Sequence, residues 1–213
     1  MKQVTIIDYG SGNLHSIAKA FEHEAAPLGI KVKISSNSED INNASHVVLP
    51  GVGAFADCLN GLKSAPGVLA SMEKAALADK KPFLGVCVGM QMLAEESLEQ
   101  GKHNGLGWIK GKVIGIDSNK TTLKVPHMGW NNLVVTKQHP ILKGIKTGDH
   151  AYFVHSYWMD CGQDNILANV DYGTAITAVI ANNNIVATQF HPEKSQELGL
   201  KILKGFGDFV KKA

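Results

Sequence analysis

The chain has 213 residues, of which 44% are hydrophobic and 19% are charged, and its formal net charge is +2. This composition is ordinary for a globular protein, and so small a net charge gives no reason to expect a nucleic-acid or membrane partner. All 21 basic residues are lysines, so an anion site must use lysine, backbone N–H groups or helix N-termini.

The cysteines and the apolar runs limit the class of protein further. Three cysteines without paired spacing, Cys58, Cys87 and Cys161, argue against a disulfide scaffold and against a structural zinc site. The N-terminal segment reaches Asp8 before any long apolar run, which disfavours a secretory signal. No run approaches the roughly 18 apolar residues of a membrane span. We therefore expect a cytoplasmic protein that needs no metal and no cofactor.

The first half of the chain alternates predicted strands and helices. Strands are predicted at 3–8, 30–34, 46–50 and 82–87, and helices at 14–29, 55–80 (broken near Pro66 and Gly67) and 89–100. Such alternation implies right-handed crossovers and a mainly parallel central sheet with helices on both faces.

The second half changes to strands and turns and then ends in a helix. Strands are predicted at 111–116, 121–125, 131–136, 150–158, 165–173, 175–184 and 185–191, with a hairpin over 180–187. The last helix covers 195–212 with Ser195 as its N-cap, and its apolar face consists of Leu198, Ile202, Leu203, Phe206, Phe209 and Val210. No repeat or linker interrupts the chain, so we interpret residues 1–213 as one α/β domain.

Cys87 lies between Gly85 and Gly89, directly after a predicted strand and before a predicted helix. This is the pattern of a nucleophile elbow, a sharp turn that exposes the nucleophile and leaves no room for side chains two residues away on either side. A helix N-terminus there would stabilise a thiolate, and the Val88 N–H would help to bind an oxyanion. The alternative is that Cys87 is a small buried apolar residue, as we expect for Cys58 and Cys161.

A base and an orienting group for such a nucleophile occur in "FHPEKS". His191 ends a predicted strand, and Glu193 follows two residues later, across a proline that terminates the strand. A carboxylate that accepts from one ring nitrogen fixes the tautomer and turns the other nitrogen toward the thiol. Alone, this segment would more often be a loop with a solvated acid.

Together, "GVCVGMQ" and "FHPEKS" resemble the triad-type class I glutamine amidotransferase family. The resemblance implies a flavodoxin-like α/β sandwich with additional antiparallel strands. It also implies hydrolysis of glutamine to glutamate and ammonia, with Cys87 as nucleophile, His191 as general acid and base, and Glu193 as orienting group.

Other segments are similar to one branch of that family, the glutaminase subunits of imidazole glycerol phosphate synthase. They are "IIDYGSGNLHSI", "LPGVGAF", "PHMGWN" and "YFVHSY", with Ser11 standing where proline is common in the branch. By this resemblance, Gly51, Val52 and Gly53 form an oxyanion strand, and Gly53, Gln91, His155, Ser156 and Tyr157 hold glutamine.

The same resemblance implies a partner chain. The branch forms a heterodimer with a cyclase subunit, a (β/α)₈ barrel that receives the ammonia, and glutaminase activity stays low until that subunit binds its ligand. The implied interface residues are Asn13, Met128, Trp130, Tyr152 and Lys194. We expect the Val52 peptide to turn on activation, so that its N–H faces the substrate carbonyl.

Four alternatives remain open at this point. They are a glutaminase of another biosynthetic pathway, a paralogous subunit that feeds a sugar-modifying amidotransferase, a non-catalytic scaffold, and a cysteine peptidase or chaperone of the flavodoxin-like class. A dinucleotide site at "YGSGN" is disfavoured because the third glycine of that motif is replaced by His15.

Overall fold

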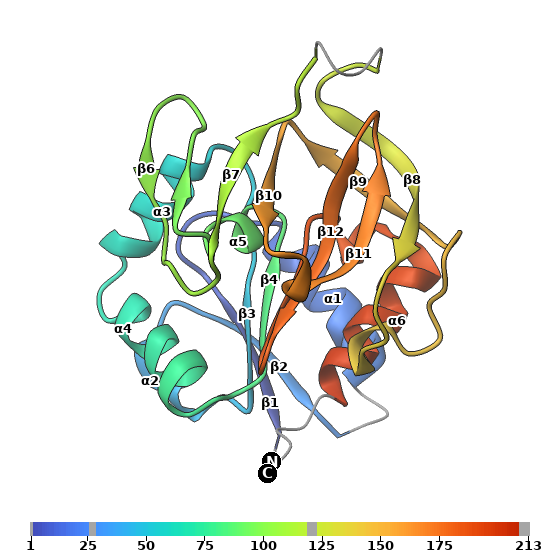
Figure 1. Cartoon of the computed structure of the whole chain (residues 1–213). Coiled ribbons are helices and arrows are strands. Elements are labelled where there is room, and N and C mark those ends of the chain that lie inside the picture. Colours follow the sequence, from blue (N-terminus) through green and yellow to red (C-terminus); the bar gives the residue numbers. More distant parts are fainter. Residues whose placement is uncertain (1, 26–28, 119–122, 209–213) are drawn as a thin grey trace.

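A nine-stranded sheet forms the centre of the computed structural model, which describes residues 2–25, 29–118 and 123–208. Its strands follow the order β2-β1-β3-β4-β13-β12-β11-β8-β9 (Figure 1). The first five run parallel: β2 (Lys31–Ser35), β1 (Gln3–Ile7), β3 (His46–Leu49), β4 (Phe83–Val86) and β13 (Ile185–Thr188). The other four continue antiparallel: β12 (Ala175–Asn182), β11 (Ile166–Asp171), β8 (His127–Val135) and β9 (His150–His155).

A smaller sheet lies beside the carboxyl end of β4 and has the order β10-β7-β5-β6. Its strands are β10 (Tyr157–Cys161), β7 (Gly111–Gly115), β5 (Glu96–Ser97) and β6 (His103–Asn104). Two antiparallel pairings and one parallel pairing hold it together.

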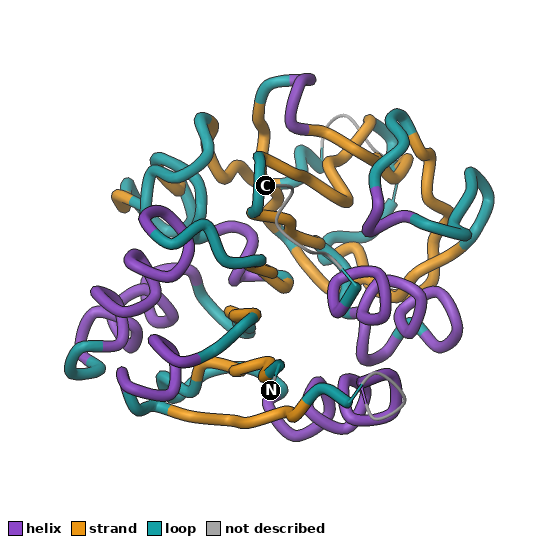
Figure 2. The backbone as a smooth tube through the Cα atoms, turned by 90° about the horizontal axis from the view of Figure 1, so that it is seen from below, coloured by secondary structure: helices purple, strands orange, loops and turns teal. Residues whose placement is uncertain are grey.

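Helices cover both faces of the parallel strands (Figures 1 and 2). One side carries α2 (Ser38–Asn43), α3 (Phe55–Ser64), α4 (Val68–Glu73) and the π-helical turn Lys74–Ala78, and the other carries α1 (Leu14–Ala25) and α6 (Gln196–Gly207). The short α5 (Val88–Gln91) follows β4, and 3₁₀ turns occur at Pro140–Leu142, Gln163–Asn165 and Pro192–Lys194. The predicted α/β class, with a parallel sheet and additional antiparallel strands, is confirmed.

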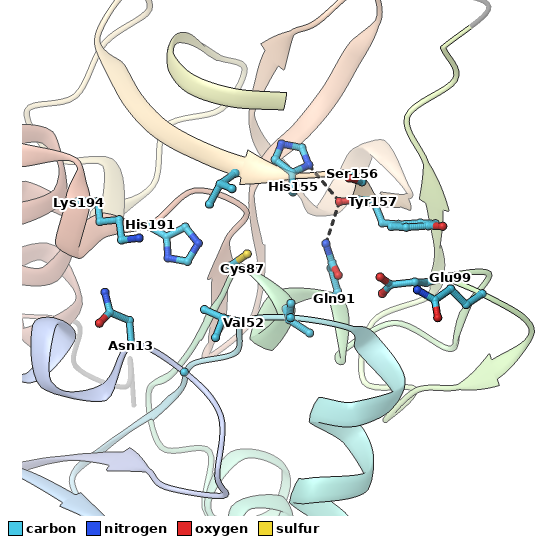
Figure 3. A pocket seen from close by; sticks show the side chains of 15 residues that line it. Asn13, Val52, Cys87, Gln91, Glu99, His155, Ser156, Tyr157, His191 and Lys194 are labelled. Carbon is cyan, nitrogen blue, oxygen red and sulfur yellow. Dashed lines mark hydrogen bonds between the residues drawn. The ribbon is translucent and has the colours of Figure 1, made fainter. Parts of the chain in front are cut away.

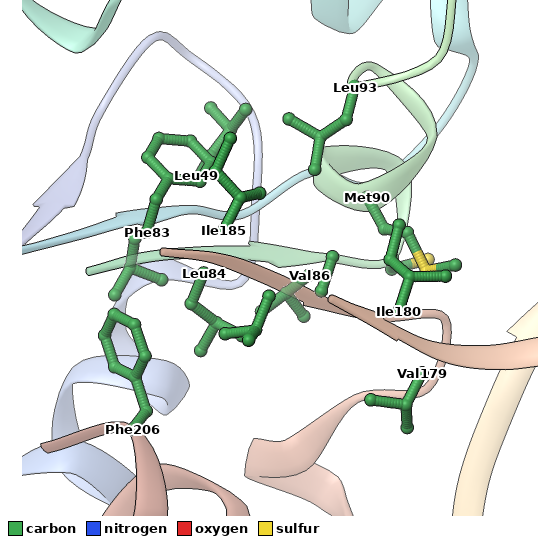
Figure 4. Close-up of a cluster of buried hydrophobic side chains, with 14 of the residues drawn as sticks. Leu49, Phe83, Leu84, Val86, Met90, Leu93, Val179, Ile180, Ile185 and Phe206 are labelled. Atoms are coloured by element: carbon green, nitrogen blue, oxygen red, sulfur yellow. The ribbon is translucent and has the colours of Figure 1, made fainter. Parts of the chain in front are cut away.

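Because both faces are covered, the central strands are almost entirely apolar, with His46 at the start of β3 and Thr188 at the end of β13 as the exceptions. Every residue of β3, β4 and β13 is buried. Figure 4 shows Phe83 of β4 beside Ile185 of β13 on one face of the sheet, while Leu84 of β4 and Phe206 of α6 lie on the other face. This rigid core fixes the ends of β3, β4 and β13, which meet at one edge of the sheet.

The predicted helix 89–100 is wrong beyond Gln91. The carbonyl oxygens of Met92, Leu93 and Ala94 accept hydrogen bonds from the backbone of Leu106, Ile109 and Gly107 instead of from a following helical turn. The helix therefore stops after one turn, and the chain continues into β5.

Several other boundaries differ from the prediction. The predicted strand 150–158 divides at Ser156, because β9 pairs with β8 in the large sheet and β10 pairs with β7 in the small one. The strand 185–191 ends at Thr188, and residues 123–125 form no strand, while 121–122 lie outside the described residues.

The final helix begins after Ser195 as predicted, but this serine makes no side-chain cap. Its hydroxyl instead donates to the His191 carbonyl and accepts from the Tyr152 N–H. Phe209 and Val210, predicted for the apolar face of this helix, lie outside the described residues.

Candidate active site

Cys87 occupies a strained turn between β4 and α5, with φ 55° and ψ −110°. The two glycines around it are required by space. A Cβ on Gly89 would lie 1.9 Å from the Leu49 carbonyl oxygen, and one on Gly85 would lie 2.9 Å from the Gly89 oxygen. An L-residue held in this conformation persists only where the surroundings impose it, which is common at catalytic centres.

His191 and Glu193 form a buried pair directly after β13. His191 Nδ1 lies 2.9 Å from Glu193 Oε1, and the two side chains are 3% and 1% exposed. Since a carboxylate only accepts, Nδ1 carries the proton and the Nε2 atom is left for another partner. Asn13 Nδ2 donates to the same Oε1 at 3.4 Å.

The imidazole of His191 lies next to the Cys87 side chain, and both line the same cavity (Figure 3). Burial alone would lower the pKa of His191, but its hydrogen bonds to Cys87 and Glu193 outweigh burial and raise this pKa to about 10. At neutral pH the ring is therefore an imidazolium that can supply a proton. The structure thus brings together the three residues that the sequence predicted to act together.

A cavity of about 720 Å³ opens over Cys87 and His191 (Figure 3). Its size is in the usual range for small-molecule sites. Most predicted site residues line it: Asn13, Val52, Gly53, Cys87, Val88, Gln91, His155, Ser156, Tyr157, His191 and Lys194. Sequence reasoning missed Gly12, Val154, Glu99 and Gln100, which line it too; the last two fell in the wrongly predicted helix.

Two of the predicted oxyanion donors, the backbone N–H groups of Val88 and Val52, donate hydrogen bonds to other parts of the protein. The Val88 N–H donates to the Gly51 carbonyl at 3.4 Å. The Val52 N–H donates to Ser11 Oγ at 3.3 Å, while the Ser11 hydroxyl donates to the Val52 carbonyl at 2.9 Å. Cys58 Sγ also donates to the Val52 carbonyl, at 3.2 Å. In this arrangement neither N–H is available to a substrate oxygen.

Comparison with known proteins identifies the family. The profile of the family "Glutamine amidotransferase class-I" matches residues 5–208. This chain belongs to the class I glutamine amidotransferase family.

Two amidotransferase relatives are named "Imidazole glycerol phosphate synthase subunit HisH". The proteins from Mesorhizobium japonicum and from Brucella abortus are each 49% identical to this chain over 210 residues, which is 96% of this chain and 97% of theirs.

Solved structures share the amidotransferase fold at much lower identity. One called "glutamine amidotransferase" has a TM-score of 0.71 at 17% identity and covers 97% of this chain and 99% of its own. A glutamine amidotransferase from Thermotoga maritima has a TM-score of 0.65 at 14% identity, covering 97% of this chain and 83% of its own.

In this amidotransferase, Gln91 contacts two protein groups rather than leaving its whole amide free for a ligand. Its Nε2 donates to the Tyr157 carbonyl at 2.8 Å and to Gln189 Oε1 at 3.1 Å. Gln189 is fully buried, and its own Nε2 lies 3.7 Å from Cys87 Sγ. The sequence analysis did not select Gln189, although its place two residues before His191 was a usable signal.

His155 is held by a second histidine. Its Nδ1 donates to the Tyr157 carbonyl at 3.0 Å, so its Nε2 must accept from His127 Nδ1 at 3.1 Å. Burial lowers the pKa of His127 to about 4 and, with the neighbouring His127, lowers that of His155 to about 3. Both rings are therefore neutral at physiological pH.

Four of the predicted interface residues form one surface beside the cavity, which we call the β8–β9 surface: Met128, Trp130, Tyr152 and Lys194. Met128 and Trp130 are 62% and 45% exposed, although such side chains are usually buried in a monomer. Trp130 packs edge-on against Tyr152, and Lys194 Nζ lies 5.8 Å from the centre of the Tyr152 ring. The fifth residue, Asn13, lines the cavity next to Lys194.

Two negative findings apply to the described residues 2–25, 29–118 and 123–208. No helix there has both the length and the hydropathy to cross a membrane. In the same ranges, no three His, Cys, Asp or Glu side chains gather in a way that would hold a metal ion.

Proposed function

We propose that this chain is the glutaminase subunit of imidazole glycerol phosphate synthase, which hydrolyses L-glutamine to glutamate and ammonia. The observation that carries the proposal is the position of His191, which is hydrogen-bonded to Glu193 and lines the same cavity as Cys87 (Figure 3). The names of relatives that are 49% identical over almost the whole chain support the choice of pathway. A single nine-stranded sheet combines strands from the first and the second half of the chain, β1 and β13 among them, which supports a single catalytic domain.

In the first step the Cys87 thiolate attacks the side-chain amide carbon of glutamine. The carbonyl oxygen becomes an oxyanion, and the protonated Nε2 of His191 gives its proton to the departing nitrogen. Ammonia leaves, and a γ-glutamyl thioester remains on Cys87. Glu193 stabilises the imidazolium and holds the ring in place.

In the second step water attacks the thioester carbon. His191, now neutral, takes a proton from that water as general base. Collapse of the tetrahedral intermediate breaks the carbon–sulfur bond, so glutamate leaves and Cys87 returns as a thiolate beside the imidazolium. The segment His155 to Tyr157, at the opposite wall of the cavity, would hold the α-amino and α-carboxylate groups of glutamine.

The oxyanion that forms in both steps must be stabilised by hydrogen-bond donors. The orientation of the Val52 N–H decides whether it can act as one of them. Its N–H donates to Ser11 and not into the cavity. A turn of the peptide between Gly51 and Val52 would release the Gly51 carbonyl from Val88 and offer both N–H groups to the oxyanion. Val52 is 42% exposed, so little packing opposes that movement.

A separate partner would use the ammonia, which is protonated and lost as a nucleophile if it escapes into water. We propose a cytoplasmic heterodimer in which the cyclase subunit, a (β/α)₈ barrel, covers the cavity and docks on the β8–β9 surface. Exposed aromatic and methionine side chains are typical anchors of such interfaces.

The test is glutamate release by the purified chain alone, with the cyclase subunit, and with that subunit and its ligand, phosphoribulosylformimino-aminoimidazole carboxamide ribonucleotide. We expect low activity alone and strong activation by this ligand. A high ammonium concentration should replace both glutamine and this chain in the synthase reaction. Full activity of the isolated chain would contradict the gating, and activation only by a different synthase would contradict the pathway.

A further inference from the structure

Gln189 is a buried amide next to the nucleophile to which the mechanism above gives no task. It follows β13, is 0% exposed, and has its Nε2 atom 3.7 Å from Cys87 Sγ. Sulfur is large, so this separation is a normal distance for a weak N–H···S hydrogen bond. A buried amide in such a position either only fills space in the core or donates a hydrogen bond to the sulfur. Which end of the amide faces Cys87 distinguishes these two roles.

The orientation of this amide follows from a chain of hydrogen bonds that starts at a backbone carbonyl. The Tyr157 carbonyl can only accept, so Gln91 must present its Nε2 to it, at 2.8 Å. The second hydrogen of the same Nε2 goes to the side chain of Gln189 at 3.1 Å, which must therefore present its oxygen. The Gln189 NH₂ group is left facing Cys87, and an amide nitrogen can only donate.

The Tyr157 carbonyl, where this series of hydrogen bonds starts, is itself held in place. The Tyr157 carbonyl accepts a second hydrogen bond from His155 Nδ1 at 3.0 Å, and His155 is held in turn by His127. Low pKa values keep both rings neutral, so the arrangement does not change near neutral pH. Every link before the sulfur is thus an ordinary hydrogen bond, and the four side chains that take part, those of Gln91, Gln189, His127 and His155, are all buried.

We propose that Gln189 is a further catalytic residue, which donates an N–H to the Cys87 thiolate, and that Gln91 is its positioning residue. This inference rests on the proposed function. A fixed donor in a buried site favours the anionic sulfur. It therefore raises the thiolate fraction before attack and makes the sulfur a better leaving group when the thioester is hydrolysed.

The first test measures the reactivity of the Cys87 sulfur in the absence of glutamine. Iodoacetamide alkylation of Cys87 is followed by peptide mass spectrometry between pH 5 and pH 9, in the wild type and in Gln189→Leu. We expect the midpoint of the pH–rate profile to rise by about one pH unit in the variant. At pH values below both midpoints, the rate should fall about tenfold, in line with one lost hydrogen bond to a charged group. A folded Gln189→Leu protein with the wild-type profile overturns the proposal.

Matched variants separate this role from a merely structural one. Asn184→Leu removes a buried amide at the other end of β13, where it donates to the Ala76 and Lys81 carbonyls. It should lower stability and leave the alkylation profile unchanged. Gln189→Glu keeps the shape of the side chain but replaces the donor with a carboxylate, and should shift the profile even if Gln189→Leu does not fold. An unshifted Gln189→Glu profile also overturns the proposal.

The second test distinguishes the failure of this inference from failure of the proposed function. In the activated complex, Gln189→Leu should lower kcat for glutamine about tenfold and change KM less than about twofold, because Gln189 contacts the sulfur and does not line the cavity. If the wild-type complex has no glutaminase activity, the proposed function fails while the alkylation profile still tests Gln189. A raised KM with unchanged kcat would assign Gln189 to substrate binding and overturn the proposal.

Discussion

The turn that carries Cys87 and the loop after β3 that carries Val52 lie side by side at the edge of the sheet, yet they are held in opposite ways. Cys87 is 4% exposed, and its backbone N–H and C=O are bonded to Thr188, Met90 and Gln91. Val52 is 42% exposed, and its peptide groups are bonded to the side chains of Ser11 and Cys58. The nucleophile is therefore fixed by the core, whereas the oxyanion donors are held by a few replaceable contacts.

This difference suits the proposed function, in which ammonia should not be released before the partner can use it. A rigid nucleophile keeps its geometry in every state, and a movable donor decides whether the transition state is stabilised. Four experiments examine the two sides of the comparison.

Removing the nucleophile should have the largest effect. Cys87→Ala should lower glutamate release in the activated complex by about a thousandfold or more, as is common when a catalytic nucleophile is lost. Cys161→Ser is the control, because burial raises the pKa of Cys161 to about 11 and leaves it a poor nucleophile. Turnover by Cys87→Ala at the wild-type rate would rule out the thioester route.

The rigidity of the elbow can be compared with the freedom of the oxyanion strand through two glycines. Gly89→Ala drives a Cβ into the Leu49 carbonyl and should lower the free energy of unfolding by about 3 kcal/mol or more. A Cβ on Gly53 would meet no atom within 4 Å, so the only cost of Gly53→Ala is the strain of the positive φ of +92°. This substitution should lower the free energy of unfolding by about 1 kcal/mol. Urea unfolding of both variants provides the measurement, and equal losses would contradict the comparison.

The elbow was predictable from the sequence because its requirements are local: two glycines, a strand before and a helix turn after. The pairing of His191 with Glu193 was predictable for the same reason. The Ser11–Val52 contacts join residues 41 positions apart, and the Gln91–Gln189 contact spans 98. No periodic pattern of apolar and polar residues in the sequence indicates contacts between side chains so far apart. The helix predicted at 89–100 failed likewise, since distant backbone N–H groups bind the carbonyls it required.

Loosening the oxyanion strand should have a smaller effect, in the opposite direction. Ser11→Ala removes two of the hydrogen bonds that hold the Val52 backbone in its present orientation and leaves the one from Cys58. Glutamate release by the isolated chain should rise about threefold to tenfold, as expected for one or two ordinary hydrogen bonds. Ser16→Ala, on the exposed side of α1, is the matched control. An unchanged or lower basal rate in Ser11→Ala would mean that Ser11 does not restrain the strand.

The smallest effect concerns the histidine pair beyond the cavity. The pKa values of His127 and His155 are lowered by burial, to about 4 and about 3. Below pH 6.5 the unfolded chain binds protons that the folded chain does not, so stability should fall as the pH falls. The slope is at most about 1.4 kcal/mol per pH unit for each histidine.

His191 does not obscure this slope, because its raised pKa acts between pH 6.5 and about pH 10. Its stabilising contribution is complete below pH 6.5 and is lost as the pH rises toward 10. Urea unfolding between pH 6.5 and pH 5 should show a shallower slope for His127→Gln than for the wild type. Identical slopes would show that the pair takes up no proton on unfolding.

The proposed reaction depends on a covalent bond between the Cys87 sulfur and the side-chain carbon of glutamine. Acid quenching of the activated complex during turnover, followed by peptide mass spectrometry, tests this directly. We predict a γ-glutamyl adduct on the peptide that contains Cys87, which should be absent in Cys87→Ala. Sustained turnover with no adduct, or an adduct on Cys58 or Cys161 alone, would contradict it.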